Sequence, residues 1–452
     1  MPHKVVNIVP QLPSDPQVHH ANEPSEAWLW MDITTSWRAR HGQMNGTLRV
    51  EQSYAQAISD LIAPQLRYCR YHRTRRCFIP VKAYPVLSGK PSTASRSVAR
   101  HKSSGLRTLG RHVERTLRNY RREIIGSVMN LGNRMTATGP GPGGPGEVLL
   151  LAGENWAQYD FNAVARLREE RGTHIAALCQ DLIPITCPQF FESDDFVARY
   201  RAYVDFLIRD VNLIVAISES TKSDILNYAR QNGGIRGHIA VVQLGADLIS
   251  AKLARPPSEL PDLRTRKFVL SVSTIQARKN FDLLYHLWHR LAEQRIPDLP
   301  MLVIVGQRGY GSQDLLRQIE RDDQTKDKIA ILHHTEDEEL SWLYQNCLWT
   351  MYPSFYEGWG LPISESLAYG KYCLASNSSS MPEAGAGLAN HLDPLDFAAW
   401  QDATVELISS PARVATLESS IRARYRPMTW VRSAEVLLNE LKTLYTVQRT
   451  GP

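Results

Sequence analysis

The chain has no long hydrophobic run and no closely spaced pair of cysteines. Its longest apolar stretches, such as EVLLLAG and FVLSVS, are the length of a strand and fall well short of the roughly 20 residues that span a bilayer. The six cysteines are scattered without a Cys-x-x-Cys pair, which suits a reducing compartment and offers no zinc site. The N-terminus also lacks the apolar core of a secretion signal. Together these absences predict a cytoplasmic protein.

Acidic residues are nearly absent from one segment of the chain. Between Arg70 and Arg134 there are 16 Lys and Arg but only Glu114 and Glu123, a balance of +14. Because the whole chain carries +6, the remainder carries about −8. A basic segment can bind nucleic acid, but its aromatic residues are scattered rather than clustered. We therefore predict no nucleic-acid partner, and keep a nucleic-acid-binding protein using residues 70–134 as an alternative.

Part of this basic segment has helical periodicity. In residues 105–131 apolar side chains recur in steps of three and four, with arginines on the flanks and the opposite face, which predicts an amphipathic helix. Such a helix can lie on an anionic membrane surface, which would make the protein peripheral on the inner face of the cell membrane. It can equally pack on the first domain with its arginines solvated. The sequence leaves both alternatives open.

Strand-sized apolar runs, each followed by a helix-length stretch, recur along the chain. In the first half they are AWLWMDIT, CFIPV, EVLLLAG, HIAALCQ, NLIVAIS and HIAVVQLG; in the second half they are FVLSVS, PMLVIVG, KIAILH, LWTMYPS and KYCLAS. Apolar strands with helical crossovers predict parallel sheets covered on both faces, and two such series predict an α/β protein with two Rossmann-like domains. We place an N-terminal domain at 1–250 with a basic helical insertion at 84–146, and a C-terminal domain at 251–425. A last helix, within 426–452, could return to the N-terminal domain.

Two polar stretches follow predicted strands in the second half. In YEGWGLPISESLAYG, residues 356–370, Glu357 and Glu365 flank a glycine turn whose backbone N–H groups could face a phosphate at a helix N-terminus. Placed in the first helical turn, Glu365 could accept hydrogen bonds from paired ribose hydroxyls, and Glu357 could do so from an attached sugar. Helix capping is the alternative for Glu365. In SVSTIQARKN, Arg278 and Lys279 follow a strand end and suit a diphosphate, although an ordinary exposed basic pair is the alternative.

In combination these stretches resemble family 4 retaining glycosyltransferases. STIQARKN, EGWGLPISESLAYG and SSMPEAGAG occur in the order and at the spacing of that family, and DLIPI, LIVAISESTKSDIL and IAVVQLGAD are similar to its first half. NGTLRVEQSYAQAI, residues 45–58, is similar to the glycine loop of bacterial polysaccharide mannosyltransferases. The resemblance covers about residues 27–66 and 147–446.

The resemblance implies a glycosyltransferase B-type (GT-B) fold with a nucleoside-diphosphate sugar between the domains. Implied partners are this donor and a saccharide or lipid-linked saccharide acceptor, and no metal or further cofactor is implied. The transferred hexose would be mannose by analogy with the most similar-looking relatives. The implied catalytic residues are Glu357 and Asp181. The implied donor-binding residues are Gly46, Arg278, Lys279, Gly358, Trp359, Gly360, Leu361 and Glu365. Where relatives have histidine before the aspartate of DLIPI, this chain has Gln180, so either Gln180 or Asp181 would take the polar role.

Two other enzyme classes share some of these features. A glycoside hydrolase also uses two carboxylates, about 5 to 9.5 Å apart across a sugar, but Glu365 behind a phosphate-binding loop is badly placed for that. A sugar-nucleotide epimerase could share the fold without needing glutamates at this spacing. The sugar, the nucleotide, the acceptor, the linkage and the oligomeric state stay open.

Overall fold

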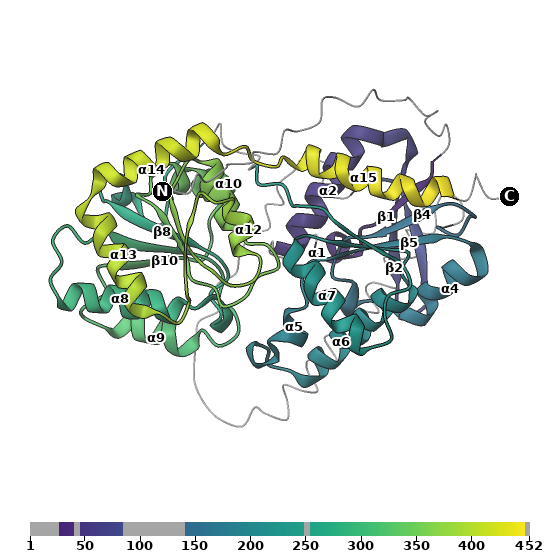
Figure 1. The fold of residues 1–452 in the computed structure, drawn as a ribbon, viewed down its shortest axis with the longest axis horizontal. Helices are drawn as coiled ribbons and strands as arrows, with labels where there is room; N and C mark the ends of the chain where they lie inside the picture. The colour runs from purple at the N-terminus through teal and green to yellow at the C-terminus, as the bar shows by residue number, and fades with distance from the viewer. Residues whose placement is uncertain (1–26, 40–45, 85–140, 248–253, 448–452) are drawn as a thin grey trace, which may run out of the picture.

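The structure is a computed structural model that describes residues 27–39, 46–84, 141–247 and 254–447 (Figure 1). The predicted amphipathic helix at 105–131 and most of the predicted insertion lie outside the described residues. None of the helices in the described ranges combines the length and the hydrophobicity that a membrane-spanning helix needs.

The first domain is built on a seven-stranded sheet. In spatial order its strands are β3 (Cys77–Val81), β2 (Leu66–His72), β1 (Leu29–Asp32), β4 (Val148–Leu151), β5 (His174–Cys179), β6 (Leu213–Ala216) and β7 (His238–Val241). All neighbours are parallel except β2 and β3, which form an antiparallel hairpin at one edge. Every residue of β1, β4 and β6 is buried, as expected of central strands covered on both faces.

The helices of the first domain connect these strands. They are α1 (Thr34–Ala39), α2 (Gly46–Ile62), α4 (Phe161–Arg171), α5 (Ile183–Thr186), α6 (Asp194–Asp210) and α7 (Glu219–Gln231). Local signals set their ends: Ser193 accepts a hydrogen bond from Phe196 N at the start of α6, and Gly172 (φ 67°) ends α4 in the left-handed region.

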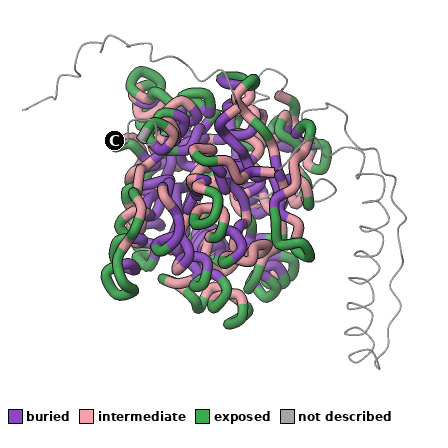
Figure 2. The backbone as a smooth tube through the Cα atoms, turned by 90° about the vertical axis from the view of Figure 1, so that its right-hand side faces the viewer, coloured by how far each residue is buried: buried purple, intermediate pink, exposed green. Residues whose placement is uncertain are grey.

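The second domain has a six-stranded sheet in which all strands are parallel. In spatial order the strands are β10 (Ile329–Leu332), β9 (Met301–Val305), β8 (Phe268–Val272), β11 (Thr350–Tyr352), β12 (Cys373–Ser376) and β13 (Asn390–Leu392). Its helices are α8 (Phe281–Glu293), α9 (Gln313–Arg321), α10 (Asp337–Asn346), α11 (Leu361–Ala368), α12 (Met381–Gly385), α13 (Phe397–Ser409) and α14 (Pro411–Arg424). Across the two domains together, buried residues run through the interior and exposed residues lie at the periphery (Figure 2, with the first domain towards the viewer).

The last helix, α15 (Trp430–Val447), leaves the second domain and lies along α2 of the first (Figure 1). The hydroxyl of Tyr54 is 2.7 Å from Oγ of Ser433, and the rings of Tyr54 and Trp430 meet edge to face. The chain re-enters the first domain beside the point where it left, since Ala246 N donates to Met428 O at 2.9 Å.

Candidate active site in the interdomain cleft

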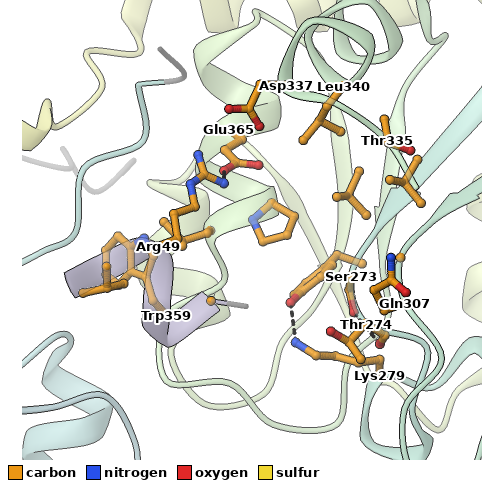
Figure 3. Close-up of a pocket in the computed structure, with 18 of the residues that line it drawn as sticks. Arg49, Ser273, Thr274, Lys279, Gln307, Thr335, Asp337, Leu340, Trp359 and Glu365 are labelled. Carbon is orange, nitrogen blue, oxygen red and sulfur yellow. Dashed lines mark hydrogen bonds and ion pairs between the residues drawn. The ribbon is translucent and has the colours of Figure 1, made fainter. Parts of the chain in front are cut away.

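A cleft of about 860 Å³ lies between the carboxyl ends of the two sheets (Figure 3). Open α/β sheets bind ligands at this edge, and the volume is in the range of small-molecule sites. The first domain contributes α2 and the loops after β5, β6 and β7 to its walls, and the second contributes the loops after β8, β9, β10 and β11. Of the residues that the sequence assigns to the site, Arg278 and Gly360 do not line the cleft. The others do: Gly46, Asp181, Lys279, Glu357, Gly358, Trp359, Leu361 and Glu365.

Glu357 is the centre of a buried polar cluster just after β11. Its Oε1 accepts hydrogen bonds from Lys279 Nζ (2.5 Å), Ser354 Oγ (2.6 Å) and Tyr352 OH (2.9 Å). Its Oε2 lies 2.9 Å from Nη1 of Arg278. The structure therefore brings Glu357 together with Lys279 and Arg278, which precede it in the sequence by 78 and 79 residues.

The charges of this cluster set its protonation at neutral pH. Burial by itself raises the pKa of Glu357, but Arg278 and Lys279 outweigh burial and lower this pKa to about 2. Burial lowers the pKa of Lys279 to about 8, against the attraction of Glu357. At pH 7 Glu357 is thus an anion and Lys279 a cation. A carboxyl group with so low a pKa cannot serve as a general acid at neutral pH, as one carboxyl group of a glycoside hydrolase must.

The two cations occupy different positions. Lys279 lies on the wall of the cleft, where its Nζ also donates to Tyr352 OH at 2.9 Å (Figure 3). The guanidinium of Arg278 is directed at Glu357 and at the carbonyl oxygen of Tyr356. A ligand in the cleft therefore meets Lys279 first, and the predicted binding of a diphosphate by both cations stays a prediction.

The glycine turn has one role that the sequence did not indicate. A Cβ atom at Gly358 would lie 2.0 Å from the carbonyl oxygen of Gln180, in the first domain, so glycine here permits the approach of the two domains. The hydroxyl of Thr221 bridges the same contact by facing the carbonyl oxygens of Gln180 (3.4 Å) and Gly358 (3.3 Å). Gly360 has φ 109° at the start of α11, a conformation that requires glycine. Trp359 Nε1 donates to Ser364 Oγ at 3.1 Å.

The sequence predicts Glu365 in the first turn of its helix, and this prediction is wrong. Helix α11 begins at Leu361, so Glu365 is its fifth residue, beyond the reach of N-terminal capping. Its carboxylate instead pairs with Arg49 (Nη1 to Oε1, 2.6 Å) and accepts a hydrogen bond from Tyr344 OH (2.9 Å to Oε2). Capping is thus the wrong interpretation, while ribose binding by Glu365 stays a prediction.

The first-domain wall holds the other assigned residues. Asp181 is partly buried, and this burial raises its pKa although Arg278 opposes the shift; its Oδ1 accepts from Ile183 N at 3.0 Å. Gln180 Oε1 accepts from Thr47 Oγ1 at 3.2 Å, so this loop is tied to α2. A Cβ atom at Gly46 would meet nothing within 4 Å, so the described structure gives no steric reason for glycine there. The assigned roles of Asp181 and Gly46 stay predictions.

Sequence reasoning missed four residues of the site: Arg49, Tyr344, Tyr352 and Ser354. Tyr352 and Ser354 could have been found, because Tyr352 ends β11 and Ser354 lies in the short loop between β11 and Glu357. Arg49 lies in the glycine-loop stretch 45–58 but carries no pattern that points to a partner in the other domain.

Comparisons with known proteins bear on this cleft. Residues 258–413 match the family model "Glycosyl transferases group 1". This match covers most of the second domain, including Arg278, Lys279, Glu357 and Glu365.

Two curated relatives come from Escherichia coli. The O-antigen chain mannosyltransferase B is 26% identical over 275 residues, which cover 58% of this chain and 69% of that protein. The serotype-specific mannosyltransferase WbdA is 23% identical over 269 residues, which cover 58% of this chain and 32% of that protein. The matched region thus spans about a third of the length of WbdA.

The fold is shared with solved glycosyltransferases. A sucrose-phosphate synthase from Thermosynechococcus elongatus superposes with a TM-score of 0.59 at 15% identity, over 94% of this chain and 100% of that one. The expectation of a GT-B fold, with two Rossmann-like domains, is confirmed.

Proposed function

We propose that this protein is a retaining, metal-independent glycosyltransferase of family 4. In this proposal a nucleoside-diphosphate hexose binds in the interdomain cleft, and the hexose passes to a saccharide or lipid-linked saccharide in polysaccharide synthesis. The observation that carries the proposal is the convergence of Glu357, Lys279 and the N-terminus of α11 on one wall of the cleft. The two mannosyltransferase relatives make mannose the first hexose to test.

The residues have the following parts in the proposed reaction. When the bond between the anomeric carbon and the diphosphate oxygen breaks, the bonding pair leaves with the diphosphate as negative charge. Lys279 and the backbone N–H groups at the start of α11 stabilise that charge in a partly water-excluded site. Glu357 holds Lys279 in place and accepts hydrogen bonds from the hexose, and Glu365 receives the ribose hydroxyls.

The proposal is tested by ligand-induced stabilisation of the purified protein. Wild-type protein in EDTA is heated with GDP-, UDP-, dTDP- or ADP-sugars, and the unfolding temperature is recorded. A rise with at least one sugar nucleotide, and none with the free hexose, is expected because the diphosphate and ribose supply most of the polar contacts. No rise with any of them would contradict the proposal.

Replacing Lys279 with alanine should weaken the binding of both the donor and the nucleoside diphosphate product. Both ligands carry the diphosphate, and the loss should be about 1.5 to 3 kcal/mol if the contact is a charge-assisted hydrogen bond. Isothermal titration with the product measures this loss. Lys326→Ala is a matched control, since Lys326 is exposed and pairs only locally with Asp323. Unchanged product affinity in Lys279→Ala would remove Lys279 from the diphosphate site.

A further inference from the structure

Arg49 lies at an electrostatically unfavourable position in its own helix. It is the fourth residue of α2, whose first turn contains no acidic residue, so its charge adds to the positive end of the helix dipole. An anion close to this cation offsets the unfavourable interaction with the helix dipole. The start of α2 faces the cleft, and the anion comes from the opposite domain.

That anion is Glu365. Arg49 reaches from α2 across the cleft so that its Nη1 lies 2.6 Å from Oε1 of Glu365 (Figure 3). The carboxylate is almost completely buried, at 1% exposure, while the side chain of Arg49 keeps 27% of its surface exposed. Glu365 holds the pKa of Arg49 above its usual range, so the guanidinium stays charged.

The two oxygens of Glu365 have different contacts. Oε1 lies against the guanidinium of Arg49 but accepts no hydrogen bond from it, whereas Oε2 accepts from the hydroxyl of Tyr344, which is itself fully buried. A ribose hydroxyl that donates to Oε1 would have to take the place of this guanidinium. Because Tyr344 is fixed in the core and Arg49 is partly exposed, Arg49 is the partner that can leave.

We propose that Arg49 is a latch that competes with the ribose of the donor for Glu365. In the donor-free protein the ion pair joins α2 to α11 and neutralises the buried carboxylate. Ribose hydroxyls displace the guanidinium, so that nucleotide binding releases this link between the two domains. The inference rests on the proposed function, since it assumes that a nucleotide occupies this cleft.

The latch predicts tighter nucleotide binding when Arg49 is removed. UDP, GDP, ADP and dTDP are titrated into wild type and Arg49→Met, and the best binder is then compared with its 2′,3′-dideoxy analogue. Arg49→Met should bind the ribonucleotide about tenfold more tightly, because no ion pair has to be broken. The dideoxy analogue has no hydroxyls to compete for Glu365, so its affinity should be unchanged. Arg49→Lys, which keeps the charge, should resemble wild type.

The controls separate the latch from the proposed function. Arg432→Met removes an exposed arginine of α15 and should leave all affinities unchanged. Arg49→Met should also unfold at a lower temperature without nucleotide, because it leaves a buried carboxylate unpaired. Ribonucleotide affinity that is equal or weaker in Arg49→Met overturns the latch. Failure of every nucleotide to bind either protein overturns the proposed function and the latch with it.

Discussion

Glu357→Gln is expected to lower the rate of hexose transfer by at least about 100-fold while the fold persists. The carboxylate of Glu357 forms ion pairs with two cations and accepts hydrogen bonds from two hydroxyl groups. It also holds Lys279 at the place where the diphosphate would leave. Glutamine keeps the size but loses the charge, so Lys279 loses its counter-ion and the hydrogen bonds to the hexose weaken. Steady-state release of nucleoside diphosphate at saturating donor measures the effect.

The fold of this variant has to be measured beside its rate. Removing one member of a buried ion pair typically costs about 3 to 5 kcal/mol of stability, so circular dichroism and thermal unfolding must show a folded protein at the assay temperature. Glu320→Gln, which changes an exposed glutamate of the same domain, is the matched control and should transfer normally. Near-normal transfer by a folded Glu357→Gln would remove Glu357 from the reacting site.

A second large effect is expected from Glu51, which is buried in the first domain close to the cleft. Its Oε1 accepts from Ser36 N at 2.7 Å, and its Oε2 is buried without a hydrogen-bond partner. Burial, reinforced by the neighbouring charge of Asp32, raises the pKa of Glu51 to about 8. Burial also raises the pKa of Asp32, to about 6. At pH 7 the folded protein therefore keeps a proton on Glu51 that the unfolded chain has lost.

This proton makes the stability of the protein depend on pH. Between pH 4.5 and about 8 the folded state binds one more proton at Glu51 than the unfolded state, so the stability that Glu51 contributes falls as pH rises. The slope is up to about 1.4 kcal/mol per pH unit. Glu51→Gln keeps an acceptor for Ser36 N and cannot ionise. It should therefore gain on the order of 3 to 4 kcal/mol over wild type between pH 5 and pH 8.

Urea unfolding of both proteins at pH 5, 6.5 and 8 measures this gain. Glu170→Gln, an exposed substitution in the same domain, should follow wild type at every pH. A difference between Glu51→Gln and wild type that does not change with pH would show that Glu51 is ionised in the folded protein at neutral pH.

Much of the fold could be predicted because its strands are buried on both faces. Runs such as VLLL and LIVA have no polar position, and they became β4 and β6 in parallel sheets. Strand β2 escaped prediction because LRYCRYH alternates with arginines, as an edge-proximal strand does. The structure shows how these charges are accommodated: Arg67 lies 5.5 Å from the ring centroid of Trp30, and Arg70 lies 5.0 Å from that of Trp37.

The site was predictable within each domain but not across the cleft. Glu357 and Lys279 could be predicted because each follows a predicted strand, and the carboxyl ends of parallel strands lie at one edge of the sheet. The contact of Gly358 with the carbonyl oxygen of Gln180 depends on how the two domains meet, as does the pairing of Arg49 with Glu365. No periodicity or motif in one domain encodes a distance to the other.

The central claim is that a nucleotide sugar is cleaved in this cleft without a metal, by the machinery around Glu357. Phosphorus NMR of wild type and Glu357→Gln, each mixed in EDTA with the sugar nucleotide that stabilises wild type most, tests it directly. Wild type should convert the donor into nucleoside diphosphate, and Glu357→Gln should leave the donor almost intact. Conversion that stops in EDTA, or that proceeds equally in Glu357→Gln, would contradict the claim.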